Sequence, residues 1–150
     1  MYYFGYCTFL NPVEMKRFFP NGKIVSKGYV QNCSIAFCAS GERTDRGWCH
    51  LDLTPSAWGK RALGIVIEHG PEQFVDYPDF KRIAITVHGE DGKVYDCWTW
   101  ILDNPGMAMK PPKAYWNHVS TGLKHYEFSE EDSKNVIDVY DAAAECPEQP

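Results

Sequence analysis

Two carboxylates in one short loop could do acid–base chemistry. Asp76 and Glu72 lie within residues 69–79, between two stretches that we predict to be strands. Burial in a pocket favours the protonated form of a carboxyl group, and such a group can act as a general acid or base near neutral pH. Either residue could instead be an ordinary solvated loop carboxylate.

A thiol and a hydroxyl follow the first predicted strand. Cys7 precedes a predicted turn and helix start, where backbone amides can lower the pKa of a thiol and make it a nucleophile. The alternative is a packed, unreactive thiol, because no histidine or basic residue is next to Cys7 in the sequence. Thr8 offers a hydroxyl to a ligand. Cys49 and His50 predict no metal site, because adjacent residues on a strand point to opposite faces.

The elements that position these residues begin with strands. Aromatic or β-branched runs bounded by turn residues predict seven short strands. They are residues 2–8, 23–30, 33–39, 47–53, 62–68, 82–87 and 94–101. The spacing of the second, third and fourth predicts a meander. The Asp-Gly turn at residues 91–92 predicts a hairpin between the last two.

Helices are predicted from their caps and from apolar residues three or four positions apart. Asn11 can cap a helix of one or two turns that begins at Pro12. A second helix begins near Pro111, and a third at Ser129, whose hydroxyl can cap it. Together these elements predict an α+β fold, a small mixed β-barrel of about six to seven strands with flanking helices.

Length and composition restrict the class of protein. The chain has 150 residues, 44% of them hydrophobic, which predicts one domain over residues 1–145 and a C-terminal tail at 146–150. The net charge is −5 and no stretch gathers basic residues, so we expect no nucleic acid partner. No apolar run could cross a membrane and no secretory signal is recognisable, so we expect no membrane partner and a cytoplasmic location. The six cysteines form no C-x-x-C pair, and in a reducing compartment free thiols are expected.

Several short motifs follow one another in an order that extends over nearly the whole chain. They are Tyr3-Phe4-Gly5-Tyr6-Cys7-Thr8-Phe9-Leu10 with the following Asn11-Pro12, Lys27-Gly28-Tyr29 with Phe37, Gly64-Ile65-Val66-Ile67, Phe80-Lys81-Arg82, Tyr95-Asp96-Cys97-Trp98, Pro111-Pro112, Tyr115, Gly122 and His125. Each motif is common by itself. Their order and spacing resemble those of the γ-glutamylcyclotransferase-like (AIG2-like) family.

The resemblance implies a lyase or transferase that needs no cofactor. In the family, the α-amine of a γ-glutamyl amine or amino acid attacks its own amide carbonyl, which forms 5-oxoproline and releases the amine. The partner would be a small γ-glutamyl-type substrate or ligand, held by a loop of backbone N–H groups, with Asp76 or Glu72 carrying the proton. The substrate-binding residues that the resemblance implies are Tyr6, Cys7, Thr8, Phe9, Leu10 and Tyr115.

The chain departs from the family pattern at the site itself. Cys7 replaces the loop glycine, Thr8 the serine and Phe9 the asparagine, so a side chain stands where backbone usually approaches the ligand. The segment that carries the family's acid–base glutamate is shortened, which leaves Asp76 as the first positional candidate and Glu72 as the second. The alternative function is therefore a catalytically inactive relative that binds a small ligand or another protein.

Two of the tryptophans lie on one face of a predicted strand. If Tyr95 and Cys97 face inward, then Trp98 and Trp100 lie outside and mark a candidate homodimer surface. Tyr115 has two interpretations as well. It could form a wall of the pocket, or anchor its helix to the sheet as a core aromatic.

Overall fold

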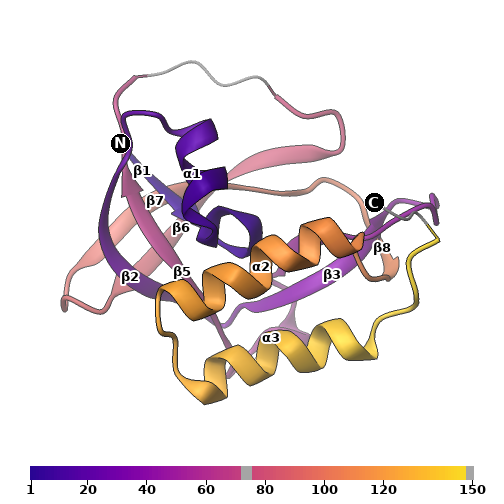
Figure 1. The fold of residues 1–150 in the computed structure, drawn as a ribbon. Coiled ribbons are helices and arrows are strands. Elements are labelled where there is room, and N and C mark those ends of the chain that lie inside the picture. Colours follow the sequence, from indigo (N-terminus) through magenta and orange to yellow (C-terminus); the bar gives the residue numbers. More distant parts are fainter. Residues whose placement is uncertain (72–75, 148–150) are drawn as a thin grey trace.

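Five strands form a closed barrel in the order β1-β5-β2-β6-β7 (Figure 1). They are β1 (Tyr2–Gly5), β2 (Lys23–Gln31), β5 (Arg61–Glu68), β6 (Phe80–Gly89) and β7 (Val94–Leu102). Neighbouring strands are antiparallel except β1 and β7, which close the barrel in parallel at Tyr3 and Trp98. This computed structural model, which describes residues 1–71 and 76–147, confirms the predicted α+β barrel, with five strands in place of six or seven.

A second sheet of three strands lies beside the barrel. It has the order β4-β3-β8 and consists of β4 (Trp48–Asp52), β3 (Ser34–Ser40) and β8 (Pro105–Ala108). The predicted meander is wrong, because β2 pairs with β5 and β6 and only β3 and β4 pair with each other. Asn32 explains the difference: it has a positive φ of 54° and donates its N–H to the carbonyl of Lys60, which turns the chain out of the barrel.

The predicted caps are confirmed at two of the helices. The side chain of Asn11 accepts the N–H of Val13 at 2.9 Å, and the hydroxyl of Ser129 accepts the N–H of Asp132 at 3.1 Å. These caps begin α1 (Pro12–Phe18) and α3 (Glu130–Ala142); the other helical elements are the single turns η1 (Cys7–Leu10) and η2 (Pro55–Ala57) and the helix α2 (Lys113–His125). The first strand ends at Gly5, so its predicted extension to Thr8 is wrong.

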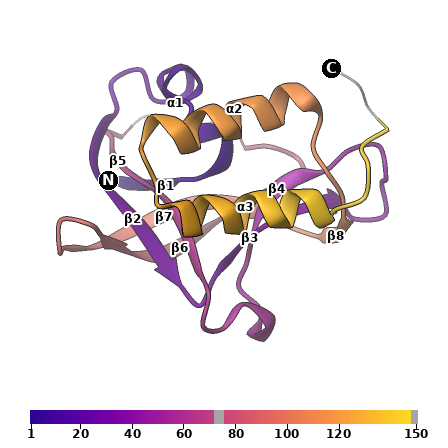
Figure 2. The same cartoon turned by 60° about the horizontal axis from the view of Figure 1, so that its bottom comes forward.

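Helices α2 and α3 lie side by side and cover the second sheet (Figures 1 and 2). The rings of Trp116 on α2 and Tyr140 on α3 stack with centroids 3.9 Å apart, and Phe37 of β3 meets both rings edge-on. These three aromatic side chains therefore join the two helices to the sheet.

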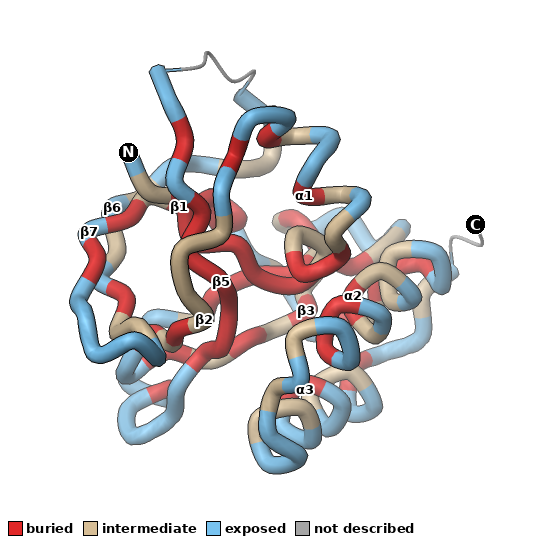
Figure 3. Tube along the Cα trace, turned by 60° about the vertical axis from the view of Figure 1, so that its left-hand side comes forward, coloured by how far each residue is buried: buried red, intermediate tan, exposed pale blue. Residues whose placement is uncertain are grey.

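The hydrophobic core extends from the inside of the barrel to Cys7 and Leu10 of η1. Figure 3 shows the buried stretches along β1 and β5. Strand β5 is buried at every position between its two ends, as expected from its continuous apolar run. Tyr95 and Cys97 are buried, but so is Trp100, which packs against Tyr3 and Tyr77 at centroid distances of 5.6 and 5.4 Å. The expected exposed pair of tryptophans is therefore wrong, because Trp100 faces a pocket and only Trp98 is partly exposed.

Candidate functional site

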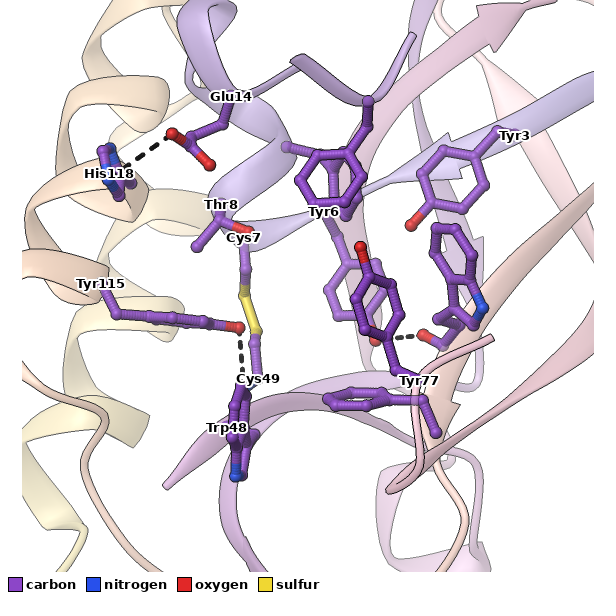
Figure 4. Close-up of a pocket in the computed structure, with 14 residues that line it drawn as sticks. Tyr3, Tyr6, Cys7, Thr8, Glu14, Trp48, Cys49, Tyr77, Tyr115 and His118 are labelled. Atoms are coloured by element: carbon purple, nitrogen blue, oxygen red, sulfur yellow. Dashed lines mark hydrogen bonds and ion pairs between the residues drawn. A yellow bond between two sulfur atoms is a disulfide. The ribbon is translucent and has the colours of Figure 1, made fainter. Parts of the chain in front are cut away.

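A pocket of about 240 Å³ lies where η1, α1, α2 and β4 meet the barrel (Figure 4). Fourteen described residues line it, and nine of them are aromatic. They are Tyr3, Tyr6, Cys7, Thr8, Phe9, Glu14, Phe18, Trp48, Cys49, Tyr77, Phe80, Trp100, Tyr115 and His118. A concave, largely apolar surface with a few polar groups is typical of small-molecule sites.

The turn η1 and the residue before it form one wall of the pocket and supply four of the predicted binding residues, Tyr6, Cys7, Thr8 and Phe9. The fifth, Leu10, is buried and faces away, because it packs against Gly122 of α2, where an added Cβ would overlap with it. The hydroxyl of Tyr6 donates to the carbonyl of Trp100 at 2.6 Å, which ties the start of the turn to β7.

The backbone of η1 has N–H groups at its N-terminal end that the hydrogen bonds of the turn do not use. The N–H of Phe9 donates to the carbonyl of Tyr6, whereas the N–H groups of Cys7 and Thr8 precede the first hydrogen bond of the turn. Cys7 has a positive φ of 54°, the left-handed region that favours glycine. The sequence comparison that placed Cys7 at a glycine position therefore agrees with its backbone conformation.

The expectation of six free thiols is wrong, because Cys7 and Cys49 form a disulfide with their Cα atoms 6.5 Å apart. Sequence spacing could not reveal this pair, since the two residues are 42 positions apart and meet only when η1 packs on β4. The bond joins the turn to the second sheet at the pocket wall. Cys33, Cys38, Cys97 and Cys146 are free.

Tyr115 reaches the same wall from α2. Its hydroxyl accepts the N–H of Cys49 at 3.1 Å and is hydrogen-bonded to Thr8. Burial raises the pKa of Tyr115, as it raises those of Tyr3 and Tyr6 well above the ordinary value. These phenols therefore stay neutral near pH 7 and can position a ligand by hydrogen bonding, but they cannot serve as bases.

Of the two loop carboxylates predicted for acid–base chemistry, the structure describes Asp76. Asp76 is exposed and forms an ion pair with Arg82 at 2.8 Å, and it is not one of the residues lining the pocket. Glu72 lies outside the described residues. Tyr77, next to Asp76, does line the pocket, with its ring 5.4 Å from that of Trp100.

Sequence reasoning missed the carboxylate that does line the pocket. Glu14 lies on α1 with its side chain 15% exposed, and its Oε1 is 3.8 Å from Nε2 of His118 on α2. The sequence did contain a signal for it, because Glu14 follows the predicted cap residue Asn11 by one helical turn. Among the described residues, no three His, Cys, Asp or Glu side chains could hold a metal ion, and no helix is long and apolar enough to span a bilayer.

The fold is shared with solved proteins. One described as "Gamma-glutamyl cyclotransferase" superposes with a TM-score of 0.78 over 97% of this chain and 88% of its own, at 18% identity. An uncharacterized protein from Homo sapiens, loc79017, has a TM-score of 0.74, with 96% and 88% coverage and 16% identity. YkqA from Bacillus subtilis has a TM-score of 0.72 at 15% identity; it matches 97% of this chain, which spans 55% of YkqA.

These likenesses give the chain a γ-glutamylcyclotransferase-like fold, as the sequence motifs predicted. No protein-family profile matches the sequence. No curated protein matches it either. At 15–18% identity the solved structures define the fold, and function must be argued from the pocket.

Proposed function

We propose that this chain is a cofactor-independent enzyme that cyclises a small γ-glutamyl amide or amine to 5-oxoproline. The observation that carries the proposal is the position of η1, which forms a wall of the pocket in a fold shared with a solved γ-glutamyl cyclotransferase. The N–H groups of Cys7 and Thr8 are suited to a carboxylate or a developing oxyanion, because they have no partner within the turn.

The proposed reaction needs one proton carrier. The α-amine nitrogen bonds to the γ-carbonyl carbon, the amide C–N bond breaks, and one proton passes from the attacking nitrogen to the leaving nitrogen. Glu14 is suited to this role because it lines the pocket. Asp76 and Glu72 remain candidates from the sequence, although Asp76 is exposed and does not line the pocket.

The test is release of 5-oxoproline from a panel of γ-glutamyl amino acids and amines. The wild type is compared with Glu14→Gln, Asp76→Asn and Glu72→Gln, each checked for folding by thermal unfolding. Loss of release in one folded variant would identify the proton carrier, and loss in Glu14→Gln alone is the expected result.

A second candidate is a binding protein that does not turn its ligand over. The exposed position of Asp76 favours it, since the carboxylate first expected to carry the proton lies outside the pocket. Ligands that bind without any release of 5-oxoproline would establish this alternative.

A further inference from the structure

The pocket has one polar end, formed by Glu14 of α1 and His118 of α2 (Figure 4). The two hydrogen bonds of the Asn11 side chain determine which ring nitrogen of His118 carries the proton. Because the Asn11 carbonyl oxygen accepts the N–H of Val13, its amide nitrogen is the donor to Nδ1 of His118 at 2.9 Å. Nδ1 is therefore unprotonated, and the neutral ring directs its Nε2–H toward Glu14.

Glu14 supplies the charge at this end. Among the described residues that line the pocket, it is the one with a charged side chain, since His118 is neutral in this arrangement. Arg17 contacts the Glu14 carboxylate at 3.0 Å, but its side chain is 69% exposed and does not line the pocket. An exposed pair of this kind is weak, so the negative charge of Glu14 remains available to a cation inside the pocket.

The rest of the pocket is aromatic. The ring of Tyr77 lies 5.4 Å from Trp100 and 6.4 Å from Phe80, and Tyr3 lies 5.6 Å from Trp100. Flat apolar groups stack favourably on such rings, and the ring faces also attract cations. No lysine or arginine lines the described part of the wall, so an anionic group would find neutral O–H and N–H donors there but no positively charged side chain.

We propose that the pocket selects an amphipathic ligand, with a primary ammonium group paired to Glu14 and a flat apolar group among Tyr77, Phe80 and Trp100. The inference deepens the proposed function and rests on it for the nature of the substrate. In a γ-glutamyl amide, the α-ammonium would be the group at Glu14 and the amide substituent would be the apolar group.

Probes that cannot cyclise test this selection apart from catalysis. Binding of 2-phenylethylammonium, neutral N-acetyl-2-phenylethylamine and anionic 3-phenylpropionate is measured by titration calorimetry and by the fluorescence of Trp48 and Trp100, which line the pocket. We expect the ammonium to bind at least about tenfold more tightly than the neutral probe, as typical for one charge-assisted hydrogen bond.

Two substitutions separate the two ends of the pocket. Glu14→Gln keeps the shape of the pocket and should abolish the preference for the ammonium probe. Tyr77→Ala should weaken the ammonium and the neutral probe alike, about three- to tenfold, and leave that preference intact. Asp138→Asn removes a surface ion pair with Lys134 on α3, outside the pocket, and should change nothing. Thermal unfolding of each variant checks that it is folded.

The outcomes are distinct from those of the 5-oxoproline assay. Equal or tighter binding of the anionic probe, no binding of any probe, or an undiminished preference in folded Glu14→Gln would overturn the inference. An ammonium preference without 5-oxoproline release would support the inference and reject the proposed reaction. Release of 5-oxoproline without that preference would support the proposed reaction and overturn the inference.

Discussion

Reduction of the bond between Cys7 and Cys49 should destabilise the protein strongly. The bond joins residues 42 positions apart. Cross-linking over such a loop lowers the entropy of the unfolded chain, which corresponds to about 4 kcal/mol of stabilisation at 25 °C. The measured loss should be somewhat smaller, because breaking the bond allows Cys7 to relax from its positive φ, a conformation that costs a residue with a side chain about 1–2 kcal/mol.

The assay is urea unfolding of air-oxidised protein with and without dithiothreitol, followed by tryptophan fluorescence. We expect the unfolding free energy to fall by about 2–4 kcal/mol on reduction. A Cys7→Ala/Cys49→Ala variant should no longer respond to dithiothreitol, whereas Cys97→Ala, which removes a free buried thiol, should respond as the wild type does. Thiol titration of the denatured, unreduced protein should give four thiols.

Two results would refute this reasoning. Six thiols in the air-oxidised, denatured protein would mean that the bond does not form. Equal unfolding free energies with and without reductant, despite four titratable thiols, would mean that the bond adds no stability. A related comparison tests the backbone: with Cys49→Ala, Cys7→Gly should be at least as stable as Cys7→Ala, because glycine adopts a φ of 54° without strain.

The remaining predictions concern a buried histidine and a helix contact. Burial lowers the pKa of His50 from 6.5 to about 4, and its Nδ1 accepts the N–H of Leu102 at 3.1 Å, so only the neutral ring fits. Between pH 6.5 and about 4, His50 takes up a proton in the unfolded chain but not in the folded protein. The unfolding free energy should therefore fall by about 3 kcal/mol as the pH decreases over this range, which urea unfolding at a series of pH values measures. His50→Asn keeps a hydrogen-bond acceptor, and in this variant that part of the pH dependence should vanish. Gly122→Ala should lower the unfolding free energy by about 1–3 kcal/mol, because the added Cβ would overlap Leu10. A melting temperature equal to or above that of the wild type would contradict the close packing of α2 on η1.

Local sequence signals determined much of the fold. The Asp-Gly turn predicts the β6–β7 hairpin, and the caps at Asn11 and Ser129 predict the beginnings of α1 and α3. The same signals could not reveal that the chain leaves the barrel after β2, because a bond from Asn32 to Lys60 directs it there. β8 was missed because its residues, Pro-Gly-Met-Ala, have low strand propensity and depend on pairing with β3.

The candidate site was less predictable because contacts between distant segments define it. A family resemblance pointed to η1, where Cys7 and Thr8 do line the pocket. It also pointed to Asp76, which is exposed and does not line the pocket. The position of Glu14 depends on α1 packing beside α2, which no local pattern records. A carboxylate near a pocket can thus be anticipated from sequence, but which carboxylate enters it is decided by tertiary contacts.

Asn11 connects the stability of the fold to the chemistry of the site. Its side-chain oxygen caps α1, and this bond fixes the amide so that the nitrogen can only donate to His118. The residue that begins the helix carrying Glu14 therefore also sets the protonated nitrogen of the histidine that faces Glu14. Since one amide makes both bonds, the orientation of Asn11 that caps α1 is also the orientation that donates to His118. The polar end of the pocket is thus assembled by the same local interaction that folds the N-terminal helix.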